Sequence, residues 1–266
     1  MVLKNLVLLA SALVAPITAS PLWHPSLPQE LPIRIVEGTS PDPDAIELSV
    51  ARNVVQLIQK RLGKDKTTAV VQSDVDAADA FWHKLLAANP QGHVSAVTRI
   101  RGYAPRSVFN STSILSWFNS VDGAAFPNAF QDTSPEHWVA IAGEKATGDP
   151  QVSTITIESW GSGPTTWFES VYAPRPAFLP ALPEFLKENQ RALQMELKDG
   201  TVMGQSLVAA RDFRELGQDV VELYQGVWVP DNTPKDVVAG LEAHITHEFA
   251  NWMRFAYKRA LSLAHA

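Results

Sequence analysis

The stretch Val220-Val-Glu-Leu-Tyr-Gln-Gly-Val-Trp-Val229 decides the fold class, because its side chains alternate between two chemical kinds. One face of the predicted strand is apolar and carries Val221, Leu223, Val227 and Val229. The other face carries Glu222, Tyr224 and Trp228. A period of two residues is typical of a β-strand whose two faces meet different surroundings.

Turn signals upstream of this strand predict that it belongs to an antiparallel sheet. Asp199-Gly200 separates two strand-like segments, 192–198 and 202–213, as a hairpin turn does. Gly161-Ser-Gly-Pro164 likewise separates the β-branched run 152–160 from its return strand, 165–172. A proline-rich excursion at 174–183 then interrupts the sheet.

Helical patterns flank the strands on both sides. Thr233-Pro234 begins a long terminal helix with apolar residues at helical spacing. Upstream, we expect a helix from Pro43 to Gly63, a second at 74–88, and a short helix or turn at 111–121. The chain is therefore predicted to be α+β, with N-terminal helices, a curved antiparallel sheet, and a long C-terminal helix that closes over it. Residues 44–266 form one domain in this prediction, after a proline-rich extended arm at 21–43 with a short strand at 33–36.

The N-terminus has the pattern of a secretory signal peptide over residues 1–20. Lys4 precedes the apolar stretch 6–14, Pro16 interrupts it, and small residues follow at 18–20. We expect the protein to be secreted or to stay in the lumen of the secretory pathway. No later segment supplies the ~20 apolar residues of a membrane-spanning helix.

Composition limits the classes of partner. The formal net charge is −6, with a sequence pI near 5.6 and no basic cluster, which argues against a nucleic-acid groove. The chain has no cysteine, so its stability must come from core burial. Asn110-Ser-Thr112 is an acceptor sequon, and we predict a glycan at Asn110.

Several familiar sites are absent from the sequence. There is no glycine-rich phosphate loop, no serine-nucleophile elbow and no cysteine nucleophile. His244-Ile-Thr-His247-Glu248 differs in order from the zinc peptidase motif. Helical geometry places His247 nearly opposite the apolar stripe and His244 well to its side, so we expect a solvated helix face and no metal site.

Acid–base candidates lie among aromatic residues on predicted strands. His137, beside Trp138, can act as a base near neutral pH, although a surface histidine before a strand is equally compatible. Glu158 lies on the same side of its strand as Trp160, and an indole neighbour raises the proton affinity of a carboxylate. If that face of the strand is exposed, Glu158 is an ordinary surface carboxylate. Arg99 and Arg101 lie in a loose basic group suited to an anionic oxygen, or are ordinary surface arginines.

The C-terminal strands resemble the last hairpin of the nuclear transport factor 2-like fold. The similar segment runs from Lys198-Asp-Gly-Thr-Val through Ala210-Arg-Asp-Phe-Arg-Glu to the strand ending at Asp231. That fold includes ketosteroid isomerases and polyketide-cyclase-like proteins. The resemblance implies a sheet curved into a cone-shaped pocket and pairing of two chains into a homodimer.

Three segments are similar to the ketosteroid isomerase-like enzymes of fungal maleidride biosynthesis. They are the leader, Pro135-Glu-His-Trp138 and Glu158-Ser-Trp-Gly-Ser-Gly-Pro164. This resemblance implies secondary-metabolite chemistry, the dimerising cyclisation of maleic anhydride monomers. For that reaction we nominate His137 as base, with Glu158 as partner or alternative, and Arg99 and Arg101 as oxyanion donors. Trp138, Trp160 and Tyr224 would wall the cavity for the small-molecule substrate, and no cofactor is required.

Two other functions fit the same pattern. A non-catalytic carrier or secreted effector would use the aromatic cavity to bind an apolar ligand. A dehydratase or isomerase on the same fold is the third reading; a dehydratase would need paired histidines, for which the sequence offers His137 and, distantly, His93.

Overall fold

The computed structural model describes residues 33–37, 45–119, 134, 136–143, 153–161, 163–176, 178 and 190–264. The predicted leader, most of the proline-rich arm and residues 179–183 of the proline-rich excursion lie outside these residues, so the predictions made there stand as predictions.

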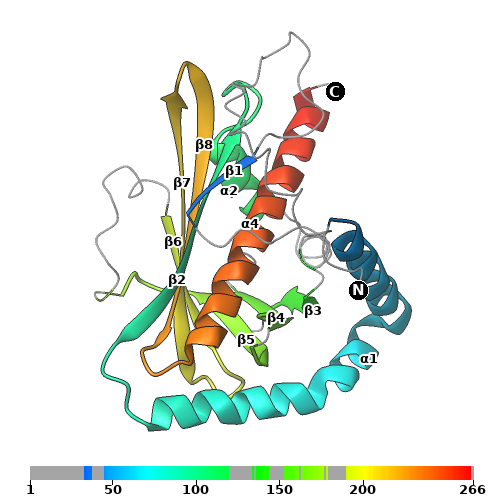
Figure 1. The fold of residues 1–266 in the computed structure, drawn as a ribbon, viewed down its shortest axis with the longest axis vertical. Coiled ribbons are helices and arrows are strands. Elements are labelled where there is room, and N and C mark those ends of the chain that lie inside the picture. The colour runs from blue at the N-terminus through cyan, green and yellow to red at the C-terminus, as the bar shows by residue number, and fades with distance from the viewer. Residues whose placement is uncertain are drawn as a thin grey trace, which may run out of the picture.

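One antiparallel sheet organises the described chain (Figure 1). Its eight strands lie in the order β1-β2-β8-β7-β6-β5-β4-β3. The strands are β1 (Ile33–Glu37), β2 (His93–Tyr103), β3 (His137–Ala142), β4 (Ser153–Ser159), β5 (Thr165–Tyr172), β6 (Gln190–Glu196), β7 (Val202–Glu215) and β8 (Gln218–Pro230). Both predicted hairpins are present, β4–β5 and β6–β7, and Gly161 and Gly200 have the positive φ that these turns require, 60° and 86°.

Helix α4 (Lys235–Ala264) crosses one face of the sheet (Figure 1) and buries its apolar stripe there. Val221, Leu223 and Val227 of β8 belong to the same core cluster as Leu241, Ile245 and Phe249 of α4. The predicted alternation along β8 is therefore confirmed: its apolar face packs under α4, and its polar face points the other way. No described helix is long and apolar enough to cross a membrane.

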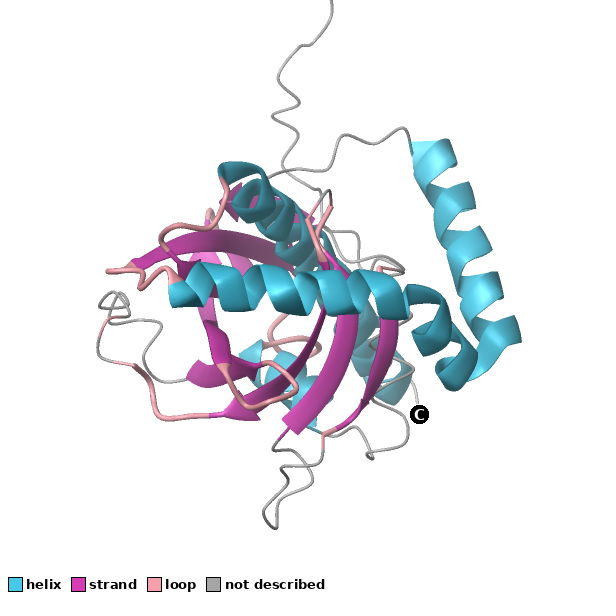
Figure 2. Cartoon of the chain, turned by 90° about the horizontal axis from the view of Figure 1, so that it is seen from below, coloured by secondary structure: helices cyan, strands magenta, loops and turns pink. Residues whose placement is uncertain are grey.

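Helix α1 (Ala45–Ala87) bends at Gly63, where φ is 72° and ψ is 172°. Its second half lies beneath the sheet, as Figure 2 shows, and packs Val71 and Val75 against Val139 of β3 and Ile157 of β4. The prediction that this second helix begins at Asp74 is wrong: helix continues from the bend at Gly63, because no glycine or proline interrupts residues 64–87. The short helix α2 (Ser111–Asn119) lies where it was predicted.

Strand β2 was missed by the sequence analysis, although it lies inside the sheet between β1 and β8. Its even-numbered residues from Ala96 to Gly102 are buried, and its odd-numbered residues are half-buried. Arginines at two of the half-buried positions mask the alternation in the sequence. This strand decides where Arg99 and Arg101 point.

Candidate functional site

Two neighbouring strands place an imidazole beside a carboxylate under α4. His137, the first residue of β3, pairs in register with Glu158 of β4. The side chain of His137 is fully buried and that of Glu158 is 7% exposed. His137 Nε2 lies 3.0 Å from Glu158 Oε2, which is within hydrogen-bond reach. The structure thus brings together the two residues nominated for acid–base chemistry.

Helix α4 adds a second imidazole and a second carboxylate at positions i and i+4, which lie on one face of a helix. His244 Nε2 lies 3.5 Å from Glu158 Oε1 and 3.5 Å from Glu248 Oε2. Glu248 Oε1 lies 3.4 Å from His137 Nε2. We call His137, Glu158, His244 and Glu248 the buried tetrad.

A close approach of backbones holds α4 against the end of β4. A Cβ atom placed on Gly240 would lie well inside contact distance of the Trp160 carbonyl oxygen and 3.8 Å from the Gly161 Cα. Only glycine fits at such a contact. Because His244 is one helical turn beyond Gly240, this contact sets the distance between α4 and Glu158.

Neighbouring groups orient the tetrad. Trp160 Nε1 donates a hydrogen bond to Glu158 Oε1, and the Trp160 indole is itself fully buried against Trp82. Glu136 Oε1 lies 3.4 Å from His244 Nδ1, on the side of the ring away from the tetrad carboxylates. Gln59 Nε2 donates to the His137 carbonyl oxygen and ties the start of β3 to α1.

Burial and charge shift the protonation of this cluster. Burial lowers the pKa of both histidines, but the surrounding carboxylates raise it more strongly. The pKa of His137 is therefore raised, and the pKa of His244 is raised well above its usual value. Burial raises the pKa of Glu158, but the neighbouring imidazoles of His244 and His137 lower it overall. Burial raises the pKa of Glu248 to about 7, against the opposing charges of both histidines. Burial and the neighbouring charges therefore move the pKa values of all four groups away from their usual values.

Three members of the tetrad are also candidate metal ligands. His137, His244 and Glu248 each offer one ligand atom, and these atoms lie within 4.8 Å of one another. The expectation of a solvated face was wrong for His244, whose side chain is only 2% exposed, because Glu136, just before the edge strand β3, and Glu158 of the neighbouring β4 lie against its ring. His247 is half-buried and contacts Asn251 through Nε2 at 3.1 Å. The spacing His-x-x-x-Glu was the sequence signal that could have found this pair.

The predicted oxyanion donors lie on the other face of the sheet. Arg99 and Arg101 extend from the odd-numbered positions of β2, and Tyr224 is the register partner of Arg99 on β8. Arg101 Nε donates to Glu222 Oε2 at 2.6 Å, and Arg211 Nε donates to Glu222 Oε1 at 2.8 Å. The alternation of β2 and β8 therefore separates these three candidates from the tetrad, and the expected meeting with His137 and Glu158 does not occur.

Of the predicted aromatic walls, Trp160 donates a hydrogen bond to the tetrad. Trp138 follows His137 on β3 and points to the opposite face, where its Nε1 donates to Ser159 Oγ at 2.8 Å. Asn110, the predicted glycan acceptor, caps α2: its Oδ1 accepts from Ser113 N at 2.9 Å and its Nδ2 donates to the Arg106 carbonyl oxygen. Glycosylation of Asn110 stays a prediction.

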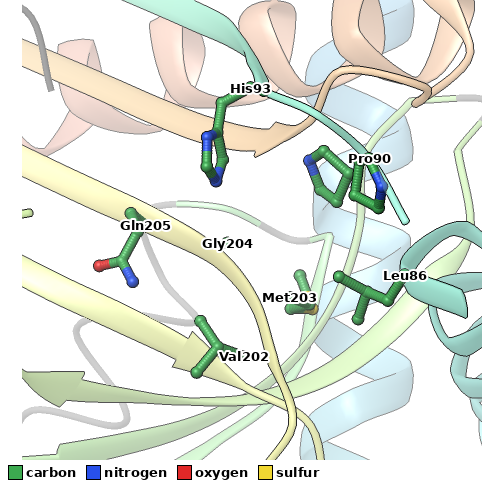
Figure 3. Close-up of a pocket in the computed structure, with 9 residues that line it drawn as sticks. Leu86, Pro90, His93, Val202, Met203, Gly204 and Gln205 are labelled. Atoms are coloured by element: carbon green, nitrogen blue, oxygen red, sulfur yellow. The ribbon is translucent and has the colours of Figure 1, made fainter. Parts of the chain in front are cut away.

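A cavity of about 140 Å³ opens elsewhere, at the ends of β2 and β7 (Figure 3). Leu86, Pro90, His93, Met203 and Gln205 are among its lining residues, and no member of the tetrad lines it. His93 stacks on Phe178 with ring centroids 3.8 Å apart. His93 is therefore not the second histidine that a dehydratase would need.

No family model and no curated protein matches this sequence. Among solved structures, a START superfamily protein from Mycobacterium smegmatis is similar over 65% of this chain and 99% of its own, at 13% identity and a TM-score of 0.39. Norcoclaurine synthase from Thalictrum flavum, in a truncated form, is similar over 65% of this chain and 97% of its own, at 14% identity and a TM-score of 0.35. At these identities and TM-scores, the activity of neither protein can be assigned to this chain.

Proposed function

We propose that the protein is an enzyme of secondary metabolism that cyclises two maleic anhydride monomers, derived from a polyketide or fatty acid, into one product. The observation that carries the chemistry is the convergence of two imidazoles and two carboxylates in the buried tetrad. The substrate class rests on the resemblance of the leader, the Pro135–Trp138 segment and the Glu158–Pro164 segment to ketosteroid isomerase-like maleidride enzymes. The nuclear transport factor 2-like assignment and the cone-shaped pocket are part of the same proposal.

The reaction begins with formation of a dienolate. Glu158, positioned beside His137, accepts a proton from the carbon that adjoins the anhydride ring, and the electron pair of that C–H bond moves into the ring and onto an anhydride oxygen. Loss of carbon dioxide from a carboxylated monomer would form the same dienolate. The dienolate carbon then forms a C–C bond to the second monomer, and the tetrad returns a proton to the adduct.

Stabilisation of the dienolate oxygen must come from this side of the sheet. Arg99 and Arg101 lie on the other face, and their guanidinium groups are paired with Glu222 or Glu37. Preorganised charge in a buried site is the largest single contribution that proteins make to such steps. The donors available around the tetrad are the two imidazoles and the Trp160 indole.

The test is a product assay with a purified maleic anhydride monomer, comparing wild type with Glu158→Gln. We expect dimeric product from wild type and at least a 100-fold loss in the variant, the lower range for one acid–base group. His247→Gln is the matched control, since it lies on α4 next to Glu248 but outside the tetrad. Binding of the monomer without turnover in wild type would support the carrier function instead.

A dehydratase is the second candidate, because the structure supplies the paired histidines that this function requires. The His137 and His244 rings have centroids 5.3 Å apart at an interplanar angle of 63°. Incubation with a β-hydroxy acid tests it by ultraviolet detection of the new C=C bond. Alkene formation that disappears in His244→Asn would favour this candidate over the cyclase.

We also propose that the enzyme enters the secretory pathway and forms a homodimer. The apolar leader supports the first part and the fold resemblance the second. N-terminal sequencing of the mature protein, mass analysis before and after deglycosylation, and light scattering test leader removal, the Asn110 glycan and the dimer in turn.

A further inference from the structure

His137, His244 and Glu248 each offer one ligand atom within 4.8 Å of the others, and the two oxygens of Glu248 each face one of the two imidazoles. Metal–ligand distances of about 2.0–2.2 Å in a tetrahedral site place neighbouring ligand atoms about 3.4 Å apart. Glu248 Oε1 lies 3.4 Å from His137 Nε2, and Glu248 Oε2 lies 3.5 Å from His244 Nε2. These contacts are longer than the ~2.7–2.9 Å of charge-assisted hydrogen bonds.

The ring nitrogens of His244 support this interpretation. Within the described residues, neither nitrogen makes a hydrogen bond of good geometry, although the side chain is only 2% exposed. Buried polar atoms are normally paired, so a buried imidazole whose neighbouring carboxylates lie at 3.4–3.5 Å is a candidate for coordination to an ion.

A further carboxylate lies where it can orient one of the two imidazoles. Metal-bound histidines usually direct their other ring nitrogen to a carboxylate, which fixes the tautomer and the orientation of the ring. Glu136 Oε1, 3.4 Å from His244 Nδ1, occupies that position and leaves Nε2 toward Glu248. Glu136 lies next to His137 in sequence, so one short segment supplies both a ligand and an outer-shell carboxylate.

Charge also favours a cation. Glu136, Glu158 and Glu248 are three carboxylates around two imidazoles, and histidines that bind metal are neutral. A divalent ion would then compensate the charges of Glu158 and Glu248, the two buried carboxylates, whereas Glu136 is 27% exposed.

We propose that His137, His244 and Glu248 bind one divalent transition-metal ion and that Glu158 remains beside it as the base. Two imidazole nitrogens and one carboxylate oxygen suit zinc, iron(II) or manganese better than magnesium or calcium, which prefer all-oxygen sites. Three protein ligands leave a coordination position open, as in catalytic zinc sites. When bound, the ion supplies the positive charge for a substrate carbonyl oxygen that the arginines cannot reach. This catalytic role rests on the proposed function, whereas binding of the ion does not.

The test measures metal binding in the absence of substrate. The purified protein is treated with a chelator, dialysed, and titrated with Zn²⁺ by calorimetry, with Mn²⁺ and Mg²⁺ as comparison ions. We expect one Zn²⁺ per chain and at least a 10–100-fold weaker affinity in His244→Asn and in Glu248→Gln, the loss that even outer-shell changes cause. Circular dichroism of each variant verifies that it is folded.

Two controls separate this site from weak surface binding. His83→Ala removes an exposed histidine whose Nε2 lies 3.5 Å from carboxylate oxygens of both Asp79 and Asp199, and it must leave the affinity unchanged. His247→Asn, on the same helix, must do the same. Glu158→Gln should keep the ion while losing cyclisation, which distinguishes failure of the proposed function from failure of the metal site.

Cobalt provides a readout that depends on ligand identity. Co²⁺ bound to a site of low coordination number has visible d–d absorption, which we expect in wild type and in Glu158→Gln but not in His244→Asn. Absence of stoichiometric Zn²⁺ binding by the folded wild type would overturn the proposal. So would an affinity that His244→Asn and Glu248→Gln leave unchanged.

Discussion

Gly240→Ala tests the close approach that sets the geometry of the tetrad. In an ordinary helix interior this change stabilises a protein by about 1 kcal/mol, because alanine restricts the unfolded chain and favours the helix. Here the added Cβ would overlap the Trp160 carbonyl oxygen and lie 3.2 Å from its carbonyl carbon. Both are backbone atoms, so α4 or the β4–β5 turn must move.

Overpacking of this kind costs about 1–3 kcal/mol, and it outweighs the gain in helix propensity. We expect the free energy of unfolding to fall by about 1 kcal/mol and Tm to fall by roughly 2–4 °C, the scale for a domain of this size. Because the shift moves His244 away from Glu158, Zn²⁺ affinity and cyclisation should fall as well.

Urea denaturation followed by circular dichroism measures the effect. Ala239→Gly, at the exposed neighbouring position of α4, reports helix propensity without the contact and should cost about 1 kcal/mol. A Gly240→Ala protein more stable than wild type would refute the close approach and with it our account of how α4 is positioned.

Four further substitutions test ion pairs and hydrogen bonds elsewhere in the structure. Glu222→Ala should lower the free energy of unfolding, measured by urea denaturation, by about 3 kcal/mol, because it removes a fully buried carboxylate between two arginines. Glu215 is partly exposed, so Glu215→Ala should lower it by less than about 1 kcal/mol. Equal losses in the two variants would contradict this account. Asn110→Ala removes the cap of α2 and should lower stability by about 1 kcal/mol, and an unchanged midpoint would argue against the cap. Trp160→Phe removes the hydrogen bond to Glu158, so we expect the free energy of unfolding to fall by about 1–3 kcal/mol and cyclisation to be reduced in the product assay. Unchanged stability and unchanged cyclisation would show that the indole does not support the tetrad.

Most of the fold was predictable because it depends on local patterns. The alternation in β8, the Asp199-Gly200 turn and the helix that begins after Pro234 each show within about ten residues, and the structure confirms all three. Strand β2 was missed because arginines occupy its half-buried face, where they pair with Glu222 from a strand more than a hundred residues away.

The tetrad was predictable only in part. His137 and Glu158 could be nominated because each lies beside a tryptophan on a predicted strand. His244 could not, because helical spacing predicts only which side of α4 is apolar; it does not predict how far the sheet wraps around that helix. Partners more than eighty residues apart meet only after the sheet has formed.

The sequence by itself determined the elements: two-residue alternation, turn glycines and the stripe of α4 follow from backbone geometry and from burial of apolar side chains. Only the tertiary structure decided which polar side chains lie together in the buried site. The parity of β2 and β8 turned Arg99, Arg101 and Tyr224 away from α4, and the contact at Gly240 brought His244 and Glu248 to His137 and Glu158. The physical reason is that a strand sends alternate residues to opposite faces, so one position in register decides whether a side chain joins the site or leaves it.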